Sequence, residues 1–492
     1  MAWHKPRRLY SAAESRAVDR CAIDRHGLPG ILLMERAARA ALRALLRRWP
    51  QPDLLQVLCG PGNNGGDGLF LAALARERGI EARVFLVDGE PRSDDARAAA
   101  GRAGAAGLEQ RPFDAAALEP RGIVVDGMLG TGIRGAPRPA YAAAIAAVNA
   151  LGRPLLALDV PSGVDGDSGA VAGEALRADL TVSFITAKRG LWTGLGPDHA
   201  GTRLLDDLDV PPAAFAAAAG IEVLELARER AQLAPLASAA HKGHFGRCLL
   251  LGGERGMGGA VLLAAESALR SGLGLLRVAT REEHLAPLLA RRPEAMVSAV
   301  RGRPELEPLL DWADAIVVGP GLGQGPWGEQ LLQAALQAQR PLLLDADALN
   351  LLARDAGWTL PPGCLLTPHP GEAARLLGTQ AAQVQGDRFA AAQRLAGRSR
   401  GAVILKGNGS LVAGSGALAL CADGNPGMAS GGMGDVLSGI GGALLAQGLA
   451  PEAAARLACV LHACAGDAAA RERGPRALLA SDLCAALGGL LS

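Results

Sequence analysis

Short apolar runs recur along the whole chain, and they have the length and composition of buried β-strands. Between them lie longer helical stretches that are rich in Ala, Leu and Arg. Strands that alternate with helices predict parallel sheets with helices on both faces. In the first half, the predicted strands are residues 54–59, 84–87, 123–126, 155–159 and 181–185.

The second half repeats this alternation and so predicts a second α/β domain. A chain of 492 residues is too long for one hydrophobic core, because cores stop growing at roughly 250–300 residues. Residues 211–240 show no clear periodicity, and we place the boundary near Arg230, with domains at residues 1–225 and 226–492. The predicted strands of the second half are residues 248–251, 275–279, 315–319, 342–345, 364–367 and 402–406, followed by a candidate hairpin at 411–414 and 417–421.

The balance of charge argues against nucleic-acid and membrane partners. Lys and Arg number 50 and Asp and Glu number 49, so the net charge of +1 provides no basic surface for phosphate backbones or anionic lipids. The eight cysteines form no CxxC pair and mostly lie in apolar runs, as expected of buried thiols in a reducing compartment. We find no signal peptide and no run of ~18 apolar residues. We therefore expect a soluble cytoplasmic protein whose phosphate-bearing ligands are held by loops.

A dense glycine-rich turn follows the first predicted strand. Residues 58–68 read LCGPGNNGGDG and precede a helical pattern that starts near Leu69. Such a turn exposes backbone N–H groups at a helix N-terminus, which suits phosphate. The turn is not a GxGxxG fingerprint, and its Asn and Asp oxygens suit a monovalent cation or a nicotinamide-side group.

Two further strand ends carry Asp, Gly and hydroxyl groups. Residues 126–135 begin with Asp126, and residues 159–165 begin with Asp159. A single Asp at a strand end is more often a cap or turn residue than a catalyst. Because the carboxyl ends of parallel strands line one crevice, three such ends together predict a ligand site.

These motifs, with the helical segments at residues 15–19 and 33–38, resemble the YjeF amino-terminal domain, the NAD(P)HX epimerase family, over about residues 9–210. NAD(P)HX is hydrated NADH or NADPH, and the fold implied is a Rossmann-like three-layer α/β/α domain. The resemblance implies that Asn64, Asp126 and Ser162 ligate a potassium ion, and we take Asp159 as the proton-transfer group. The substrate contacts it implies are Asn63, Asn64, Gly65, Gly66, Asp67, Gly130, Thr131, Gly132, Ile133, Arg134, Gly135, Ala136 and Asp159.

The second half contains a run of small residues that leads into a helix. Residues 425–439 read NPGMASGGMGDVLSG, and Asp435 falls in the first turn of the predicted helix. Free backbone N–H groups at such a turn can stabilise a transferred phosphoryl group, and Asp435 can take a proton from an attacking hydroxyl. The run therefore indicates phosphoryl transfer without a Walker A motif. Residues 319–323, 367–372 and 406–410 also follow predicted strands and are expected at the same edge of the sheet.

These loops, with residues 241–246 and 258–260, resemble the ADP- or ATP-dependent NAD(P)HX dehydratase domain, a ribokinase-like α/β fold, over about residues 241–491. The resemblance implies magnesium bound with ADP or ATP, and Glu372 is a candidate metal contact. Ser410 stands where many relatives have Thr, which keeps the hydroxyl. The implied hydrate contacts are Ala260, Gly323, His369 and Asp435, and the implied nucleotide contacts are Lys406, Gly407, Asn408, Gly409, Ser410 and Gly434.

Together the two halves resemble the bifunctional NAD(P)H-hydrate repair enzymes. The resemblance implies epimerisation of R and S NAD(P)HX and dehydration of the S form, at the expense of ADP or ATP, which gives AMP or ADP and phosphate. It also implies a homo-oligomer that acts on small molecules, without nucleic acid or membrane. Two rival interpretations stay open at this point: a small-molecule kinase, and a non-catalytic binding module in the first half.

The remaining histidines give little further information about function. His462 lies in an apolar helical run and is expected in the core. The histidines expected at the surface are His4, His26, His199 and His284.

Overall fold

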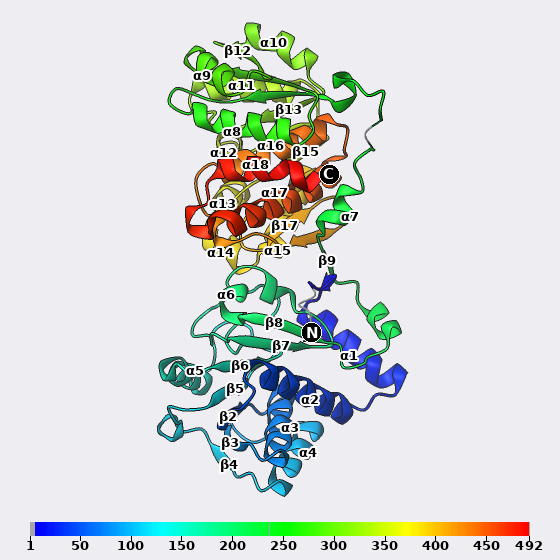
Figure 1. The fold of residues 1–492 in the computed structure, drawn as a ribbon, viewed down its shortest axis with the longest axis vertical. Coiled ribbons are helices and arrows are strands. Elements are labelled where there is room, and N and C mark those ends of the chain that lie inside the picture. Colours follow the sequence, from blue (N-terminus) through cyan, green and yellow to red (C-terminus); the bar gives the residue numbers. More distant parts are fainter. Residues whose placement is uncertain (1–4, 236, 492) are drawn as a thin grey trace. The chain divides into compact units, whose positions relative to one another are not determined.

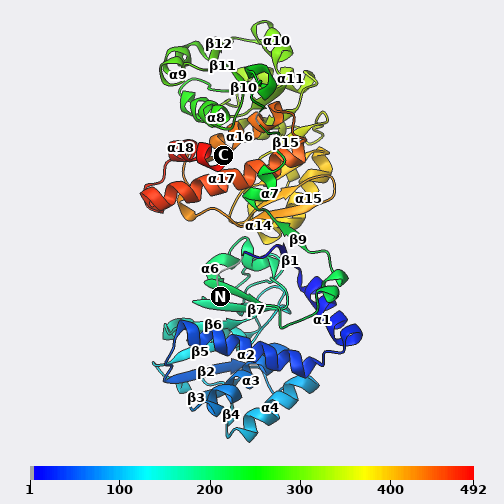
Figure 2. The same cartoon turned by 45° about the vertical axis from the view of Figure 1, so that its right-hand side comes forward.

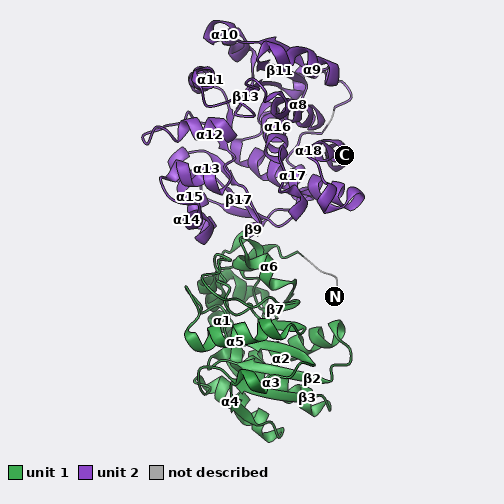
Figure 3. Cartoon of the chain, turned by 90° about the vertical axis from the view of Figure 1, so that its left-hand side faces the viewer, with its two compact units in different colours: residues 1–221 green, residues 222–492 purple. Residues whose placement is uncertain are grey.

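The chain divides into two compact α/β units, Met1–Ile221 and Glu222–Ser492 (Figure 3). The structure is a computed structural model and describes residues 5–235 and 237–491. Within these residues, no helix is long and apolar enough to span a membrane. The two-domain α/β architecture expected from the sequence is confirmed.

The sheet of unit 1 has the strand order β4-β3-β2-β5-β6-β7-β8, which can be followed through the lower half of Figure 1. All of these strands pair in parallel. The chain leaves β2 toward one side and returns to β5 on the other, so the order reverses between β2 and β5. In an open parallel sheet, the carboxyl ends at such a reversal form the ligand crevice. The strands are β2 (Leu54–Cys59), β3 (Glu81–Leu86), β4 (Gln110–Pro112), β5 (Ile123–Gly127), β6 (Leu155–Leu158), β7 (Leu180–Phe184) and β8 (Thr202–Asp206).

Helices cover both faces of this sheet and give unit 1 its three layers. One face packs against α2, α3 and α4, and Figure 2 shows α2 and α3 in front of the strands. The other face packs against α5, whose Tyr141, Ile145 and Val148 are buried against strand side chains. The helices are α1 (Ala12–His26), α2 (Gly30–Arg48), α3 (Asn63–Glu77), α4 (Asp94–Ala105) and α5 (Pro139–Leu151), with a short α6 (Gly196–Ala200).

The sheet of unit 2 runs β9-β18-β17-β16-β15-β14-β13-β10-β11-β12. Strands from β12 to β16 pair in parallel, and β16, β17 and β18 are antiparallel neighbours, so the expected hairpin is confirmed. The strands are β9 (Ile221–Val223), β10 (Arg247–Leu251), β11 (Leu275–Thr280), β12 (Met296–Ala299), β13 (Ala315–Val318), β14 (Leu342–Leu344), β15 (Cys364–Leu366), β16 (Ala402–Leu405), β17 (Ser410–Ala413) and β18 (Leu418–Cys421).

One face of this second sheet forms the large core of unit 2 with α8, α16, α17 and α18. Figure 3 shows α11, α12, α13 and α15 on the opposite side of the sheet. The helices are α7 (Leu226–Arg230), α8 (Gly258–Arg270), α9 (Leu285–Arg291), α10 (Arg303–Trp312), α11 (Pro326–Gln337), α12 (Ala346–Leu352), α13 (Pro370–Leu377), α14 (Ala381–Gly386), α15 (Arg388–Ser399), α16 (Met433–Ala446), α17 (Pro451–Arg473) and α18 (Ala480–Leu491).

Two expectations from the sequence are wrong. Helix α3 begins at Asn63 rather than near Leu69, so residues 63–68 of the glycine-rich run are themselves helical. His199 is buried, and its Nδ1 lies 2.8 Å from the carbonyl oxygen of Leu176, because α6 packs into the unit instead of lying on its surface. His462 lies inside as expected, with Nε2 2.9 Å from the Met433 carbonyl oxygen, and His4 lies outside the described residues.

Candidate active sites

In unit 1, Asp126 joins the ends of β5 and β6. Its carboxylate is fully buried and accepts hydrogen bonds from the Ser162 N–H at 2.7 Å, the Ser162 Oγ at 2.7 Å and the Met128 N–H at 3.1 Å. Burial raises the pKa of Asp126 to about 6, although the bonds from Ser162 and Met128 oppose that rise. The loops after these two strands are therefore held together through one carboxylate.

Asn64 connects α3 to the same cluster. Its Nδ2 donates to the Leu129 carbonyl oxygen at 2.9 Å, and the Leu129 N–H donates to Ser162 Oγ at 3.0 Å. Asn64 Oδ1 is buried and has no hydrogen-bond partner among the residues described. A buried oxygen without a donor is rare in proteins and suits a ligand of a hard cation. The structure thus brings together Asn64, Asp126 and Ser162.

Asp159 is anchored through one of its two carboxylate oxygens. Oδ1 accepts from Lys188 Nζ and from the Phe184 N–H at 3.2 Å. Lys188 is only 2% exposed and also donates to the Phe184 carbonyl oxygen at 2.7 Å. A Cβ placed on Gly130 would lie 3.9 Å from Asp159 Oδ2, so the second oxygen faces the loop after β5. The backbone of Asp159 is left-handed, with φ of 64°.

The positive charge of Lys188 also acts on two further carboxyl groups, those of Asp67 and Asp19. Burial, with a contribution from Asp159, raises the pKa of Asp67 well above its ordinary value, and Lys188 opposes this. Burial likewise raises the pKa of Asp19 to about 6. Asp19 and Lys188 were not predicted, because α1 and the segment after β7 lie far from the glycine-rich motifs in the sequence.

The other predicted contacts of unit 1 lie around this cluster. Asn63 Oδ1 accepts from Ser93 Oγ at 2.6 Å, and Arg134 Nη2 is 3.7 Å from Asp167 Oδ2. A Cβ on Gly65 would lie 1.8 Å from the Gly60 carbonyl oxygen, so α3 can begin this close to β2 only with glycine there. Most of the loop after β5 is exposed, namely Gly132, Arg134, Gly135 and Ala136, while Gly130, Thr131 and Ile133 are half-buried.

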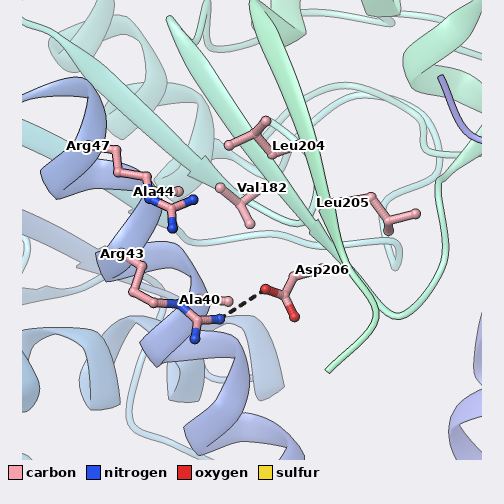
Figure 4. Close-up of a pocket in the computed structure, with 8 residues that line it drawn as sticks. All are labelled: Ala40, Arg43, Ala44, Arg47, Val182, Leu204, Leu205 and Asp206. Carbon is pink, nitrogen blue, oxygen red and sulfur yellow. Dashed lines mark hydrogen bonds and ion pairs between the residues drawn. The ribbon is translucent and has the colours of Figure 1, made fainter. Parts of the chain in front are cut away.

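Unit 1 also has a small hollow away from these strand ends, between α2 and β8. In Figure 4, Arg43 reaches from α2 to Asp206 on β8, with Arg43 Nη2 3.1 Å from Asp206 Oδ2. None of the predicted site residues lines it. The lining residues are Ala40, Arg43, Ala44, Arg47, Val182, Leu204, Leu205 and Asp206.

In unit 2, Asp435 lies in the first turn of α16, as predicted. Burial raises its pKa to about 7, the carboxylate of Asp345 adds to the rise, and Lys406 opposes it. Gly432 caps the helix in the left-handed region, with φ of 87°. A carboxyl group with this pKa can accept a proton near neutral pH.

Lys406 lies beside Asp435 but is paired with Asp345. Lys406 Nζ is 2.7 Å from Asp345 Oδ1, and Ser438 Oγ donates to Asp345 Oδ2 at 2.7 Å. Burial lowers the pKa of Lys406, but the carboxylates of Asp345 and Glu372 outweigh it, so the pKa lies above its ordinary value. A Cβ on Gly434 would lie 3.4 Å from Lys406 Nζ, which places Gly434 against this pair. Asp345 was predicted only as a strand end.

His369 and Glu372 form the start of α13. His369 Nδ1 accepts from the Gly371 N–H at 2.9 Å, and Glu372 Oε2 accepts from the His369 N–H at 2.8 Å. Burial, with Lys406, lowers the pKa of His369, which agrees with an unprotonated Nδ1. Burial raises the pKa of Glu372 to about 7, and Glu372 Oε2 is 3.9 Å from Lys406 Nζ.

The remaining predicted residues of unit 2 lie at the same sheet edge. The Gly323 N–H donates to Asp347 Oδ2 at 2.9 Å, and a Cβ on Gly321 would lie 3.1 Å from Ala260 Cβ. The loop of residues 406–410 joins β16 to β17, and Ser410 Oγ donates to the Gly407 carbonyl oxygen at 3.0 Å. The serine hydroxyl therefore shapes this loop.

Both halves of the chain match families of known proteins. The family described as NAD(P)H-hydrate dehydratase matches residues 248–488, and the family described as YjeF-related protein N-terminus matches residues 31–190. A bifunctional NAD(P)H-hydrate repair enzyme Nnr of Coxiella burnetii is 45% identical over 478 residues, which cover 96% of this chain and 97% of the relative. The Escherichia coli enzyme of the same name is 42% identical, covering 97% of this chain and 93% of the relative.

Solved structures match the second half. The ADP/ATP-dependent NAD(P)H-hydrate dehydratase from Bacillus subtilis, co-crystallised with ATP and Mg²⁺, is 33% identical, with a TM-score of 0.50. The match covers 55% of this chain and 97% of that structure. A ribokinase-like superfamily protein from Enterococcus faecalis is 31% identical, with a TM-score of 0.52.

Proposed function

The chain belongs to the family of bifunctional NAD(P)H-hydrate repair enzymes, and on this premise we propose that it restores hydrated NADH and NADPH in two steps, one in each unit. Unit 1 interconverts the R and S hydrates. Unit 2 dehydrates the S hydrate at the expense of ADP or ATP, and the products are NAD(P)H, phosphate and AMP or ADP.

In unit 1, Asp159 moves the proton that epimerisation needs. The hydrate carries a hydroxyl on the carbon next to the ring nitrogen. Protonation of that oxygen lets it leave as water while the nitrogen lone pair forms a C=N bond, and water then returns to the other face. Lys188 holds Asp159 Oδ1, so Oδ2 is directed toward the loop that binds the hydrate.

Asn64, Asp126 and Ser162 would hold a potassium ion beside this loop. The support is chemical, because all three offer oxygen, and structural, because Asn64 Oδ1 is buried without a donor. A bound potassium ion would supply positive charge where the hydrated nucleotide binds. The contacts proposed for the hydrate in unit 1 are Asn63, Asn64, Gly65, Gly66, Asp67, Gly130, Thr131, Gly132, Ile133, Arg134, Gly135, Ala136 and Asp159.

In unit 2, Asp435 starts the dehydration by taking the proton of the hydrate hydroxyl. The oxygen attacks the terminal phosphorus of the nucleotide, and the bond from that phosphorus to the leaving nucleotide breaks. The ring nitrogen lone pair then forms a C=N bond and the C–O bond breaks, so phosphate leaves with the electron pair. Loss of a proton from the neighbouring carbon restores the reduced ring. Asp435 beside Lys406 and Gly434, with its pKa raised to about 7, is the observation that carries this proposal.

The other groups of unit 2 position the two substrates. Lys406, Gly407, Asn408, Gly409, Ser410 and Gly434 contact the nucleotide, while Ala260, Gly323 and His369 contact the hydrate. Glu372 is the residue of this chain that would hold a magnesium ion brought with the nucleotide. When bound, magnesium would offset the phosphate charge.

We also propose a cytoplasmic homo-oligomer. All eight cysteines are free thiols, which fits a reducing compartment. A small-molecule kinase fused to a binding module is not favoured, because relatives named as repair enzymes match the chain across both units.

The test supplies both hydrate epimers with magnesium, potassium and ADP, then ATP, and follows the near-ultraviolet absorbance of the restored reduced ring. We expect complete conversion by the native chain. Asp159→Asn should restore only the S hydrate, and Asp435→Asn should epimerise without restoring either. Asp311→Asn, an exposed carboxylate on α10, is the control. Loss of both activities in either folded site variant would contradict separate sites.

A further inference from the structure

Arg388 is the largest fully buried side chain among the described residues. It is the first residue of α15, and burial lowers its pKa to about 10. Removing a guanidinium from water is costly, and a helix N-terminus disfavours a positive charge. Neither burial nor helix position therefore favours arginine here, so the reason for its presence lies in its contacts.

The guanidinium of Arg388 lies under the loop of residues 406–410. Its Nη2 lies within hydrogen-bond distance of three main-chain carbonyl oxygens at both ends of the loop, at 3.3 Å from Leu405, 3.1 Å from Lys406 and 3.5 Å from Gly409. Its Nη1 donates to Gln385 Oε1 at 2.7 Å. A planar group with several fixed donors can thus hold the start and the end of the loop at a constant separation.

The middle of the loop rests directly on this group. A Cβ on Gly407 would lie 2.8 Å from Arg388 Nη1 and 2.9 Å from Nη2, so only glycine allows this approach. Its φ of 138° also requires glycine. The Lys406 carbonyl and the Gly407 N–H belong to one planar peptide group and point in opposite directions. Because Arg388 binds that carbonyl, it also fixes the direction of the Gly407 N–H, which faces Ser410 Oγ at 3.3 Å.

We propose that Arg388 is a positioning residue for the phosphoryl donor: it holds the main chain of residues 406–410 in the shape that receives the nucleotide phosphates. This inference rests on the proposed function, because it takes that loop as the nucleotide site. Arg388 acts through the loop and does not contact the hydrate. Its removal should therefore weaken nucleotide binding selectively.

The test compares Arg388→Lys with Arg398→Lys. Arg398 lies on the same helix and also donates to a main-chain carbonyl, that of Leu376 at 2.8 Å, but it does not contact the loop. Calorimetry gives the Kd of magnesium-ATP and magnesium-ADP, and steady-state assays give the KM of nucleotide and of hydrate. We expect Arg388→Lys to raise the nucleotide Kd and KM about tenfold. Lysine keeps the positive charge but has no planar guanidinium that could bind the carbonyl oxygens at both ends of the loop. The hydrate KM should change less than about twofold, as should every constant of Arg398→Lys.

Gln385→Ala is a second variant, because Gln385 is exposed and its loss only loosens Arg388. It should raise the nucleotide Kd about two- to threefold. The loss of binding free energy is then less than half of that for a tenfold rise in Kd. If the Kd and KM of the nucleotide are unchanged in both variants, the positioning role of Arg388 is overturned, while the proposed function of unit 2 stands. Equal changes in the nucleotide and hydrate KM would assign Arg388 a general structural role and overturn it as well. If the native chain binds no nucleotide, the proposed function of unit 2 fails and this inference fails with it.

Discussion

Replacing Asp435 by Asn should stabilise unit 2 while abolishing dehydration. The pKa of Asp435 rises from 3.8 to about 7, chiefly through burial. The folded state then binds more protons than the unfolded state between these two values, so the carboxyl group lowers stability as the pH rises through that window. Three pKa units at 1.36 kcal/mol each give a cost of about 4 kcal/mol above pH 7. A neutral amide of the same shape avoids this cost.

The assay is thermal unfolding of the native chain and Asp435→Asn at pH 8.5 and pH 5.5. At pH 5.5 about half of the cost is relieved by protonation, and the expected advantage of the variant falls to about 2 kcal/mol. Even 2 kcal/mol shifts the melting of a unit this size by roughly 4–8 °C. Asp311→Asn, which changes an exposed carboxylate on α10, is the control variant. A variant less stable than the native chain at pH 8.5, or an advantage that does not shrink in acid, would refute the argument that desolvation sets this pKa.

Three other predictions follow from the charge clusters. Lys188→Met should slow epimerisation at least about tenfold, because Asp159 Oδ1 then loses the ammonium that holds it; dehydration serves as the internal control. Exchanging potassium for tetramethylammonium should slow only epimerisation, and Asn64→Ala should be insensitive to the exchange; equal sensitivity would exclude Asn64 as a ligand. Asp345→Asn should move the acid limb of the dehydration rate to lower pH, because Asp345 raises the pKa of Asp435 and Lys406 lowers it; a shift to higher pH in the pH–rate profile would contradict this.

Much of the fold follows from local pattern. Residues 54–59 form β2 as predicted, because a fully buried central strand is a nearly continuous apolar run, which only Gln56 interrupts here. The edge strands β4 and β8 were not predicted, since the polar residues Gln110, Arg111 and Arg203 break the apolar pattern. Helix α3 was placed six residues late because its first turns contain three glycines, Gly65, Gly66 and Gly68, which are poor helix formers.

Only those site residues that lie within short sequence motifs could be predicted. Asn64, Asp126 and Asp435 lie in glycine-rich runs at strand ends, and such runs are visible in the sequence. Lys188 and Arg388 have no such signal, because a lysine after an apolar strand or an arginine at the start of a helix ordinarily lies in solvent. Only the tertiary fold turns these two cations inward, and their partners are main-chain oxygens as well as side chains.

The two units share one arrangement of charged groups, but the lysine at its centre has a different role in each. Each places several carboxyl groups around a single lysine, which is buried in unit 1 and half-buried in unit 2. In unit 1 Lys188 bonds the proposed catalytic carboxylate itself, which fixes one oxygen of Asp159 and directs the other toward the hydrate loop. In unit 2 Lys406 bonds Asp345 instead, so Asp435 is left to respond to burial, and its pKa rises to about 7. A general base works best when its pKa is near the working pH, so the pairing of Lys406 with Asp345, rather than with Asp435, makes Asp435 suitable as a base at neutral pH.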